Sequence, residues 1–182
     1  FVDLYRGQKT GFFIDQRPNR LQVQQLADNA DVLNLFAYSS AFSAHALHGG
    51  ARSVLDVDIS QRAPYAARQN IQNNRSHNAI HRYVVADAFP FIDQLATHGP
   101  RYDMVIVDPP SLVRKRDRNQ VKRAMGVYTK LNRNAMRTVR DGGLLVTASC
   151  STPISQEDFF EVVRRAATSA RVQTRLLSYN LH

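Results

Sequence analysis

Short apolar runs alternate along the chain with longer stretches that have helical periodicity. Five of the runs are continuous rather than alternating, which is typical of strands buried on both faces of a parallel sheet. They lie at Val32–Tyr38, Ser53–Ile59, Tyr83–Ala88, Tyr102–Asp108 and Gly143–Cys150. A further run, Thr174–Tyr179, is predicted to form a sixth strand.

Helices are predicted between these strands. They cover Ala41–His48, Gln61–Asn74, Phe89–His98, Asn119–Arg140 and Ser155–Ser169. Ser155, three residues before Asp158, has the pattern of a helix N-cap, and Asp141-Gly142-Gly143 supplies a stop for the preceding helix. Strand–helix repetition of this kind predicts an α/β fold, a doubly wound Rossmann-like sandwich with helices on both faces of a mostly parallel sheet.

The first residues have a different pattern. Leu4–Lys9 and Phe12–Asp15 flank Thr10-Gly11, which predicts a β-hairpin. Pro18 then leads into an amphipathic helix over Leu21–Ala30. We therefore expect residues 1–17 to be an N-terminal β-hairpin extension and residues 18–182 to form the main domain.

Charge and composition narrow the class of partner. The chain has 182 residues, enough for one core, and 24 Lys plus Arg against 15 Asp plus Glu, a net charge of +9. This favours an anionic partner, nucleic acid before a membrane surface, with a basic solvated surface as the alternative. The densest charge lies at Arg114–Arg118 and continues to Arg140.

The number of cysteines and the hydropathy of the chain indicate in which kind of cell compartment the protein is expected. A single cysteine excludes an internal disulfide framework and fits a reducing compartment, the cytoplasm or an organelle matrix. No run reaches the ~18 apolar residues of a transmembrane helix. No signal-peptide pattern is visible, although the sequence begins at Phe1 without a methionine.

Polar residues follow the predicted strands at the edge where such sheets bind ligands. Asp58 lies at the end of the second strand, where a carboxylate can accept from both ribose hydroxyls of a nicotinamide or S-adenosylmethionine (SAM) cofactor. Asp87 follows the third and can accept from an adenine amino group. For both residues, capping of the next helix is an open alternative.

The fourth and fifth strands are followed by more specific features. Asp108-Pro109-Pro110 is a stiff turn whose two prolines have no amide donors. Such a rigid, carbonyl-rich turn is suited to binding the edge of a flat base. Cys150, the only thiol, ends the fifth strand between serines. It is either a small buried hydrophobe or, because of its place near Asp108, a nucleophile.

Taken together, several segments resemble one known family. They are Gln8–Arg20 (QKTGFFIDQRPNR), Val32–Tyr38, Gly49–Ala51, Val57–Ser60, Asp108–Leu112 and Gly142–Ser151 (GGLLVTASCS). They resemble the SAM-dependent methyltransferases that methylate carbon 5 of cytosine in large-subunit ribosomal RNA. The resemblance implies a class I methyltransferase fold, SAM as cofactor and RNA, most simply ribosomal RNA, as partner. It implies no membrane and no metal, and it leaves the oligomeric state open, a homodimer included.

The resemblance also implies roles for single residues. The implied cofactor-binding residues are Phe36, Tyr38, Ser39, Ser40, Asp58, Ile59, Asp87, Ala88 and Asp108. The implied substrate-binding and catalytic residues are Asp108, Pro109, Pro110, Lys115, Arg17 and Cys150. Asp58 would hold the ribose, Asp87 the adenine and the loop Phe36–Ser40 the methionine end. Cys150 would attack carbon 6 of a cytosine that has left its stack. The basic helix and the Gln8–Arg20 segment would bind phosphates.

The chain departs from the family pattern in three ways. Members usually have an N-terminal RNA-binding domain and a seventh, antiparallel strand, and we expect neither here. Where the family reads Thr-Gly-Gly, this chain has Ser39-Ser40-Ala41. A residue other than glycine in a left-handed conformation costs on the order of 1–2 kcal/mol. Three hypotheses follow: an active methyltransferase, an inactive RNA-binding or ribosome-associated scaffold, and a nicotinamide-dependent oxidoreductase, although no G-x-G-x-x-G is present.

Overall fold

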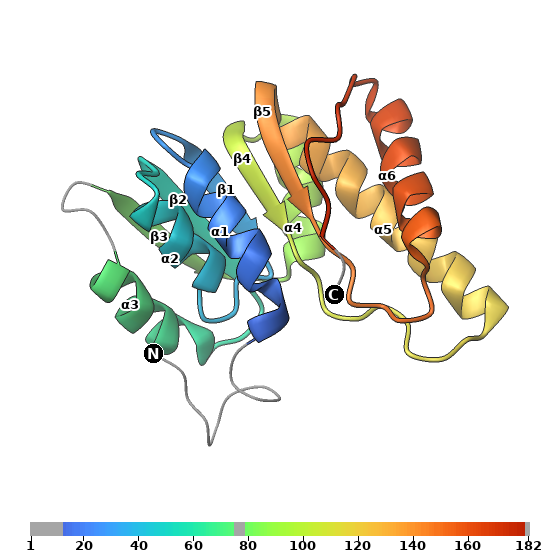
Figure 1. Cartoon of the computed structure of the whole chain (residues 1–182), viewed down its shortest axis with the longest axis horizontal. Helices are drawn as coiled ribbons and strands as arrows, with labels where there is room; N and C mark the ends of the chain where they lie inside the picture. Colours follow the sequence, from blue (N-terminus) through green and yellow to red (C-terminus); the bar gives the residue numbers. More distant parts are fainter. Residues whose placement is uncertain (1–12, 75–78, 181–182) are drawn as a thin grey trace. The chain divides into compact units, whose positions relative to one another are not determined.

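The computed structural model describes residues 13–74 and 79–180. The chain divides into two compact units, one of residues 1–86 with 176–182 and one of residues 87–175. Within each unit, strands alternate with helices along the chain (Figure 1), and every strand pairing is parallel. The predicted Rossmann-like α/β architecture is therefore confirmed.

The first unit contains a parallel sheet in the order β3-β2-β1. Its strands are β1 (Asp31–Leu35), β2 (Ser53–Asp58) and β3 (Ile80–Val85). Its helices are α1 (Arg17–Leu26), α2 (Ala41–His48) and α3 (Ala63–Asn74), and α2 packs against both of the others. The turn after α2 needs a glycine, because a Cβ at Gly49 would lie 1.9 Å from the backbone oxygen of Gln24.

The second unit is built around the parallel pair β4 (Tyr102–Val107) and β5 (Val139–Thr147). Its helices are α4 (Ala88–His98), α5 (Arg118–Thr138) and α6 (Gln156–Ala170), with α5 packed against both α4 and α6. Part of its core is a buried cluster that includes Val113, Ala124, Tyr128, Ile154 and Val162.

The positions of α2 to α4 and α6 agree closely with the prediction, and two of the helix starts have a visible cause. The prediction for α1 is wrong at both ends: the helix covers Arg17–Leu26 instead of Leu21–Ala30, because Pro18 lies inside its first turn rather than before it. α2 has the predicted bounds. Ser155 caps α6 by accepting from the amide of Asp158, as predicted. Asp117 caps α5 in the same way, with 2.8 Å between its Oδ1 and the amide nitrogen of Gln120.

The predicted stop after α5 is wrong. The helix already ends at Thr138, and Asp141-Gly142-Gly143 lies inside β5. The β4–β5 register shifts there, since Tyr102 pairs with Val139 and Met104 with Leu144. The extra residues form an irregularity in the strand, and Gly142 takes a φ of 76° that suits glycine.

The strands differ from the prediction in burial and in their ends. β4 is buried on both faces for most of its length, whereas β3, at the edge of the three-stranded sheet, has exposed and half-buried residues. β3 also begins and ends three residues earlier than predicted, so Asp87 and Ala88 lie beyond it. Continuous apolar sequence alone does not distinguish a central strand from an edge strand.

The two ends of the described chain require corrections. Residues 1–12 of the predicted hairpin lie outside the described residues, and Ile14–Gln16 forms a 3-10 helix instead of a strand end. Thr174–Tyr179 forms no strand. This segment contacts α1 through side chains, with 3.0 Å between Ser178 Oγ and Gln22 Oε1. Among the described helices, none is long and apolar enough to cross a membrane.

Candidate active site

The loop between β1 and α2 takes a glycine-like backbone although it contains no glycine. Phe36, Tyr38 and Ser40 have φ angles of 60°, 44° and 63°. Each left-handed residue other than glycine costs roughly 1–2 kcal/mol. Contacts from the surrounding structure must therefore offset this cost.

Side chains from β2, β3 and α3 hold this loop by its backbone. Asp58 Oδ2 accepts from the amide of Tyr38 at 2.9 Å. The hydroxyl of Tyr83 donates to the carbonyl of Tyr38 at 2.9 Å. Asn70 Nδ2 donates to the carbonyl of Ser39 at 2.9 Å. Both backbone polar groups of Tyr38 are thus fixed by side chains distant in sequence.

The hydroxyl of Tyr83 remains a donor at ordinary pH. Burial raises the pKa of Tyr83 above that of a free tyrosine, and the nearby charges of Asp58 and Asp56 raise this pKa further. Its bond to the loop is consequently stable to changes of pH across the physiological range.

Beneath the loop lies a fully buried carboxylate, Asp56. Its Oδ2 accepts from the hydroxyl of Ser40 and lies 2.7 Å from Nε2 of His81. Its Oδ1 accepts from the hydroxyl of Ser43 and from Asn34 Nδ2 at 3.1 Å. A buried carboxylate is tolerated only when it is well hydrogen-bonded. Here four side chains fulfil that requirement, two of them from the loop and the helix that follows it.

The Asp56 contact determines where the extra atoms of Ser40 lie. Ser40 is 0% exposed and its hydroxyl is bonded to the buried Asp56, so its side chain points into the protein. Ser39 is also buried. At Ser40, the atoms that serine adds to glycine are therefore inside the fold and not on the outer side of the loop. The loop is compatible with a bound cofactor in this respect.

Asp58 does not cap α3. That helix starts at Ala63, and its first amide donates to the hydroxyl of Ser60 at 3.2 Å. Asp58 instead accepts from Tyr38 and from the amide of Ser60 at 2.8 Å. A carboxylate has four lone pairs, so acceptor capacity remains for two hydroxyls. Ile59 beside it is 71% exposed and offers an apolar surface next to the carboxylate.

In the second unit, Asp87 takes the capping role that the sequence left open. Its Oδ1 accepts from the amide of Phe89 at 3.0 Å, at the start of α4. Asp87 is nevertheless exposed, so a ligand can still reach its carboxylate while it caps the helix. The next residue, Ala88, is buried.

The cysteine and the Asp-Pro-Pro turn lie together in the second unit. Cys150 is exposed, and its Sγ lies 3.4 Å from the carbonyl oxygen of Pro109. Asp108 is half-buried and Pro110 exposed. The exposure of the thiol contradicts the alternative that Cys150 is a buried hydrophobe. An exposed thiol beside a rigid carbonyl-rich turn is an arrangement that can present a sulfur to a flat ligand.

Tyr128 supports this arrangement from α5. It is fully buried, and its hydroxyl lies 3.0 Å from Ser151 Oγ, which also accepts from the amide of Leu112 at 3.0 Å. Burial raises the pKa of Tyr128, an effect opposed by hydrogen bonds to the neighbouring serines and strengthened by Cys150 and Asp108. Ser151, after β5, therefore links the segment after β4 to Tyr128 of α5.

Sequence reasoning missed Asp56, Asn70, Tyr83 and Tyr128. Tyr128 lies in an apolar seam of α5 with Ala124 and Leu131, a spacing that indicates burial but not its partner. The other three are polar side chains whose only signal is their place within or directly after buried segments.

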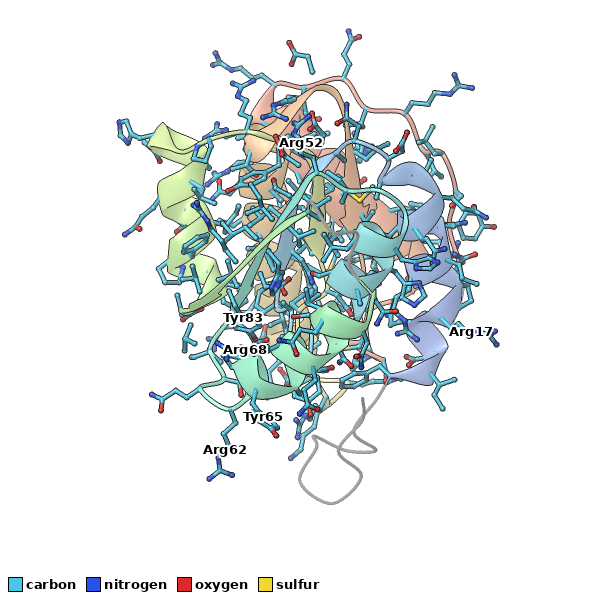
Figure 2. All side chains as sticks on the ribbon, turned by 90° about the vertical axis from the view of Figure 1, so that its left-hand side faces the viewer. Arg17, Arg52, Arg62, Tyr65, Arg68 and Tyr83 are labelled. Atoms are coloured by element: carbon cyan, nitrogen blue, oxygen red, sulfur yellow. The ribbon has the colours of Figure 1, made fainter. Side chains whose placement is uncertain are left out.

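The cationic residues predicted to bind substrate have different surroundings. Lys115 in the second unit and Arg17 at the start of α1 are exposed, and the Arg17 side chain extends into solvent (Figure 2). Arg20, in the segment predicted to bind phosphates, is 3% exposed and donates to the carbonyl of Phe13 at 2.8 Å. Arg20 is thus a structural residue, which corrects the prediction for that position.

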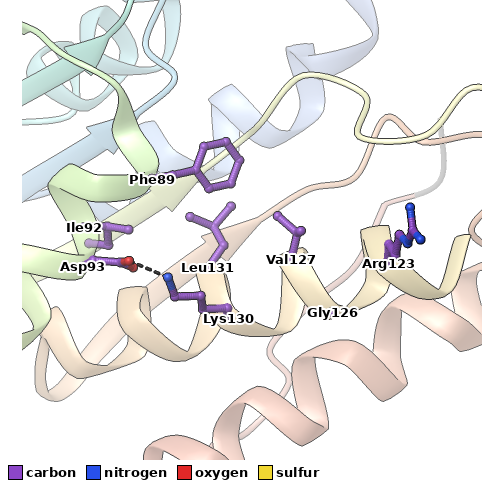
Figure 3. A pocket seen from close by; sticks show the side chains of 8 residues that line it. All are labelled: Phe89, Ile92, Asp93, Arg123, Gly126, Val127, Lys130 and Leu131. Carbon is purple, nitrogen blue, oxygen red and sulfur yellow. Dashed lines mark hydrogen bonds and ion pairs between the residues drawn. The ribbon is translucent and has the colours of Figure 1, made fainter. Parts of the chain in front are cut away.

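A separate groove of about 440 Å³ lies between α4 and α5 (Figure 3). Lys130 Nζ lies 2.5 Å from Asp93 Oδ2 within it. Its lining residues are Phe89, Ile92, Asp93, Arg123, Gly126, Val127, Lys130 and Leu131. Two of its lining residues, Arg123 and Lys130, belong to the basic helix predicted to bind phosphates, whereas none of the predicted cofactor-binding or catalytic residues lines it.

Comparison with known proteins identifies the family. Residues 1–179 match the family described as S-adenosylmethionine-dependent methyltransferase. The chain is 41% identical over 178 residues to a ribosomal RNA large subunit methyltransferase of Deinococcus radiodurans, covering 97% of this chain and 43% of the relative. It is 36% identical over 169 residues to ribosomal RNA large subunit methyltransferase I of Salmonella paratyphi B, covering 93% and 41%.

Solved structures agree with this family. A structure described as a methyltransferase complexed with SAH is 30% identical, with a TM-score of 0.77, over 91% of this chain and 43% of that one. The SAM-dependent methyltransferase from Agrobacterium tumefaciens, at 24% identity and a TM-score of 0.73, shares the fold over 87% of this chain and 51% of its own.

A Rossmann-like α/β fold with polar residues following its strands defines a class of nucleotide-cofactor proteins. Within that class, the chain belongs to the S-adenosylmethionine-dependent methyltransferase family. It spans less than half the length of the curated relatives it matches. The nicotinamide alternative has no support from these matches.

Proposed function

We propose that this chain is the catalytic part of a SAM-dependent methyltransferase that forms 5-methylcytosine in large-subunit ribosomal RNA. The observation that carries the proposal is the exposed thiol of Cys150, 3.4 Å from the carbonyl oxygen of Pro109. Two curated relatives named as large-subunit ribosomal RNA methyltransferases support the choice of RNA.

SAM would supply the methyl group, and the first unit provides residues that suit it. Asp58 has acceptor capacity for the ribose hydroxyls, and exposed Ile59 suits an apolar face of the adenine. The fixed loop Phe36–Ser40 would contact the methionine end. Asp87 and Ala88 in the second unit are assigned to the adenine by the family pattern.

Cys150 would act as a nucleophile toward the flipped cytosine, held by Asp108 and Pro109. A bond from its Sγ to carbon 6 makes carbon 5 nucleophilic enough to accept a methyl group. After methylation, loss of the carbon 5 proton to a base and elimination of Sγ from carbon 6 restore the aromatic ring and the free thiolate. The exposure of Cys150 is compatible with this approach.

Calorimetric titration with SAM tests the cofactor assignment. We expect saturable heat with one site per chain. A folded protein that gives no heat at about 1 mM SAM, a concentration at which even a Kd near 0.1 mM would be saturated, contradicts the enzyme and favours the RNA-binding scaffold.

The reaction itself is tested with Cys150→Ala. We expect 5-methylcytosine, measured by mass spectrometry of digested large-subunit ribosomal RNA, to fall by on the order of 10³-fold or more, because loss of a nucleophile removes the covalent route. SAM affinity should stay unchanged. Ser149→Ala, at the residue directly before Cys150, is the matched control and should retain activity. Turnover retained by Cys150→Ala would show the cysteine to be structural.

A further inference from the structure

The outer side of α3, together with the residue directly before it, presents an arginine, a tyrosine and a second arginine. Arg62, Tyr65 and Arg68, here named the α3 stripe, are spaced by three residues and so follow one side of the helix. Arg62 lies about one helical turn before Tyr65, since the amide of Tyr65 donates to the carbonyl of Arg62 at 3.3 Å. The ring of Tyr65 is 70% exposed, both arginines are exposed, and Arg62 and Tyr65 extend outward from the helix (Figure 2).

Packing of the first unit does not account for the α3 stripe. The opposite side of α3 buries Ala63, Ala67, Asn70 and Ile71. These residues anchor the helix, and Asn70 also holds the loop after β1. A tyrosine on the outer side contributes little to folding while exposing a large ring that must be solvated.

The sequence on either side of the α3 stripe, between Asp58 and Asp87, has charge of one sign. Between Asp58 and Asp87 the sequence has no Asp or Glu, and it has four arginines, at positions 62, 68, 75 and 82. A surface helix that depended on ion pairs would alternate its charges. Cations without local acids, interleaved with an exposed aromatic ring, are instead complementary to a polyanion that also has flat apolar groups.

A shallow groove of about 320 Å³ adjoins the ring. It is lined by Pro64, Tyr65, Arg68, Gln69 and Gln72. Two rings give it apolar walls, and the two glutamines supply donors and acceptors suited to the edge of a base. The groove therefore offers both a stacking surface and hydrogen-bonding groups.

We propose that the α3 stripe binds an unpaired nucleotide of RNA, with the base stacked on Tyr65 and the flanking phosphates on Arg62 and Arg68. The proposal rests on the RNA substrate proposed above and adds a contact surface outside the catalytic residues. α3 follows directly after Asp58 and Ile59, and its Asn70 bonds the loop after β1. RNA held by the stripe is thus bound at the helix that supports the proposed cofactor loop.

Binding of a short fluorescently labelled single-stranded RNA, followed by anisotropy at several salt concentrations, tests this proposal. Tyr65→Ala should weaken binding roughly 5- to 100-fold, the range for loss of one stacked base, and leave the salt dependence unchanged. Tyr65→Phe keeps the ring and should bind like the wild type. This pair separates stacking from any effect of the hydroxyl.

The arginines have a different signature in the same assay. Arg62→Gln and Arg68→Gln should each reduce the slope of log K against log salt by about 0.7, the value for one phosphate contact on a single strand. Arg52→Gln is the matched control of equal net charge. Arg52 precedes β2, at the edge of the sheet opposite to the start of α3 (Figure 2), and pairs with Asp31 at 2.5 Å. Its loss should leave the slope unchanged.

Each outcome decides a different point. If the wild-type protein binds RNA and Tyr65→Ala binds it equally well, the RNA-binding role of the α3 stripe is contradicted and the proposed function is unaffected. Wild-type protein that binds no RNA overturns both. Loss of binding to phosphatidylserine vesicles in the stripe variants, with RNA binding unaffected, would show a membrane surface instead and also overturn the proposal. Circular dichroism of each variant verifies that it is folded.

Discussion

Ser40 takes a backbone conformation that usually requires glycine, and its contact with Asp56 stabilises that conformation. The hydroxyl of Ser40 is a donor that glycine lacks, and the buried Asp56 needs donors. The bond to Asp56 thus offsets the cost of the left-handed φ of Ser40, and the same bond offsets part of the desolvation cost of Asp56.

A double-mutant cycle tests this pairing. Asp56→Asn should lower the free energy of unfolding by about 2–3 kcal/mol, because several bonds to a buried charge are lost. Ser40→Gly should change it by under about 1 kcal/mol, since relief of strain offsets the lost bond. In the Asp56→Asn background, Ser40→Gly should be stabilising. Urea denaturation gives all four values, and strictly additive effects would show that the two residues are not coupled.

Tyr83 provides a pH test at the same loop. An unfolded tyrosine titrates near pH 10, and the fold raises the pKa of Tyr83 above that value. As pH rises, the unfolded chain therefore loses this proton first, so the stabilisation is complete below about pH 10 and is lost above it.

Tyr83→Phe should reduce the fall of stability between pH 10 and pH 11, by up to about 1.4 kcal/mol per pH unit. Urea denaturation from pH 8 to pH 11 measures it. Tyr65→Phe, the same substitution on an exposed ring, is the control. Equal pH profiles for the two variants would contradict a role for the hydroxyl of the half-buried Tyr83.

The residues found from the sequence differ in kind from those it missed. Asp58 ends β2, and Asp87, Pro109 and Cys150 come shortly after strands, so strand prediction alone is enough to predict them at the ligand edge. Asp56 is inside β2, and its role depends on the left-handed turn of Ser40, which local propensity does not predict. Contacts between segments distant in sequence explain the difference.

At the scale of elements, local sequence signals predicted the bounds of α2, α4 and α6 closely, whereas the start of α1, the end of α5 and the strand ends differ from the prediction. The N-cap at Ser155 is a local sequence signal, and the structure confirms it. The irregularity of β5 at Gly142 depends on its register with β4, and the fate of Thr174–Tyr179 depends on whether a partner strand is available. Both depend on pairing partners, which a single sequence does not specify.

Two glycines give opposite predictions for one substitution. Gly126 lies inside α5 with nothing within 4 Å of an added Cβ, so Gly126→Ala should stabilise the protein by about 0.5–1 kcal/mol. Gly49→Ala should destabilise it by about 2 kcal/mol or more, because the Cβ would lie 1.9 Å from the backbone oxygen of Gln24. Thermal or urea denaturation compares them. A loss of stability in Gly126→Ala would show that α5 needs its glycine.

At the scale of the molecule, the net charge of +9 raises the question of whether RNA binding is diffuse or local. α5 alone has six cations and no acid over Arg118–Thr138. Lys122 and Arg123 lie near its start, and Arg137 lies in its last turn. At 1.5 Å per residue these ends are roughly 20 Å apart, about twice the Debye length at physiological salt. Contacts at the two ends can therefore be distinguished.

If binding is local and uses the start of α5, Lys122→Gln with Arg123→Gln should lower the slope of log K against log salt by about 1.4. Arg137→Gln should leave it unchanged, because screening prevents a distant charge from acting on a bound phosphate. If only net charge mattered, each lost cation would weaken binding alike. Equal effects per charge at the two ends would thus contradict a defined phosphate path along α5. A larger effect per charge for Lys122 and Arg123 would locate the path at the end of the helix nearer to Asp108 in the sequence.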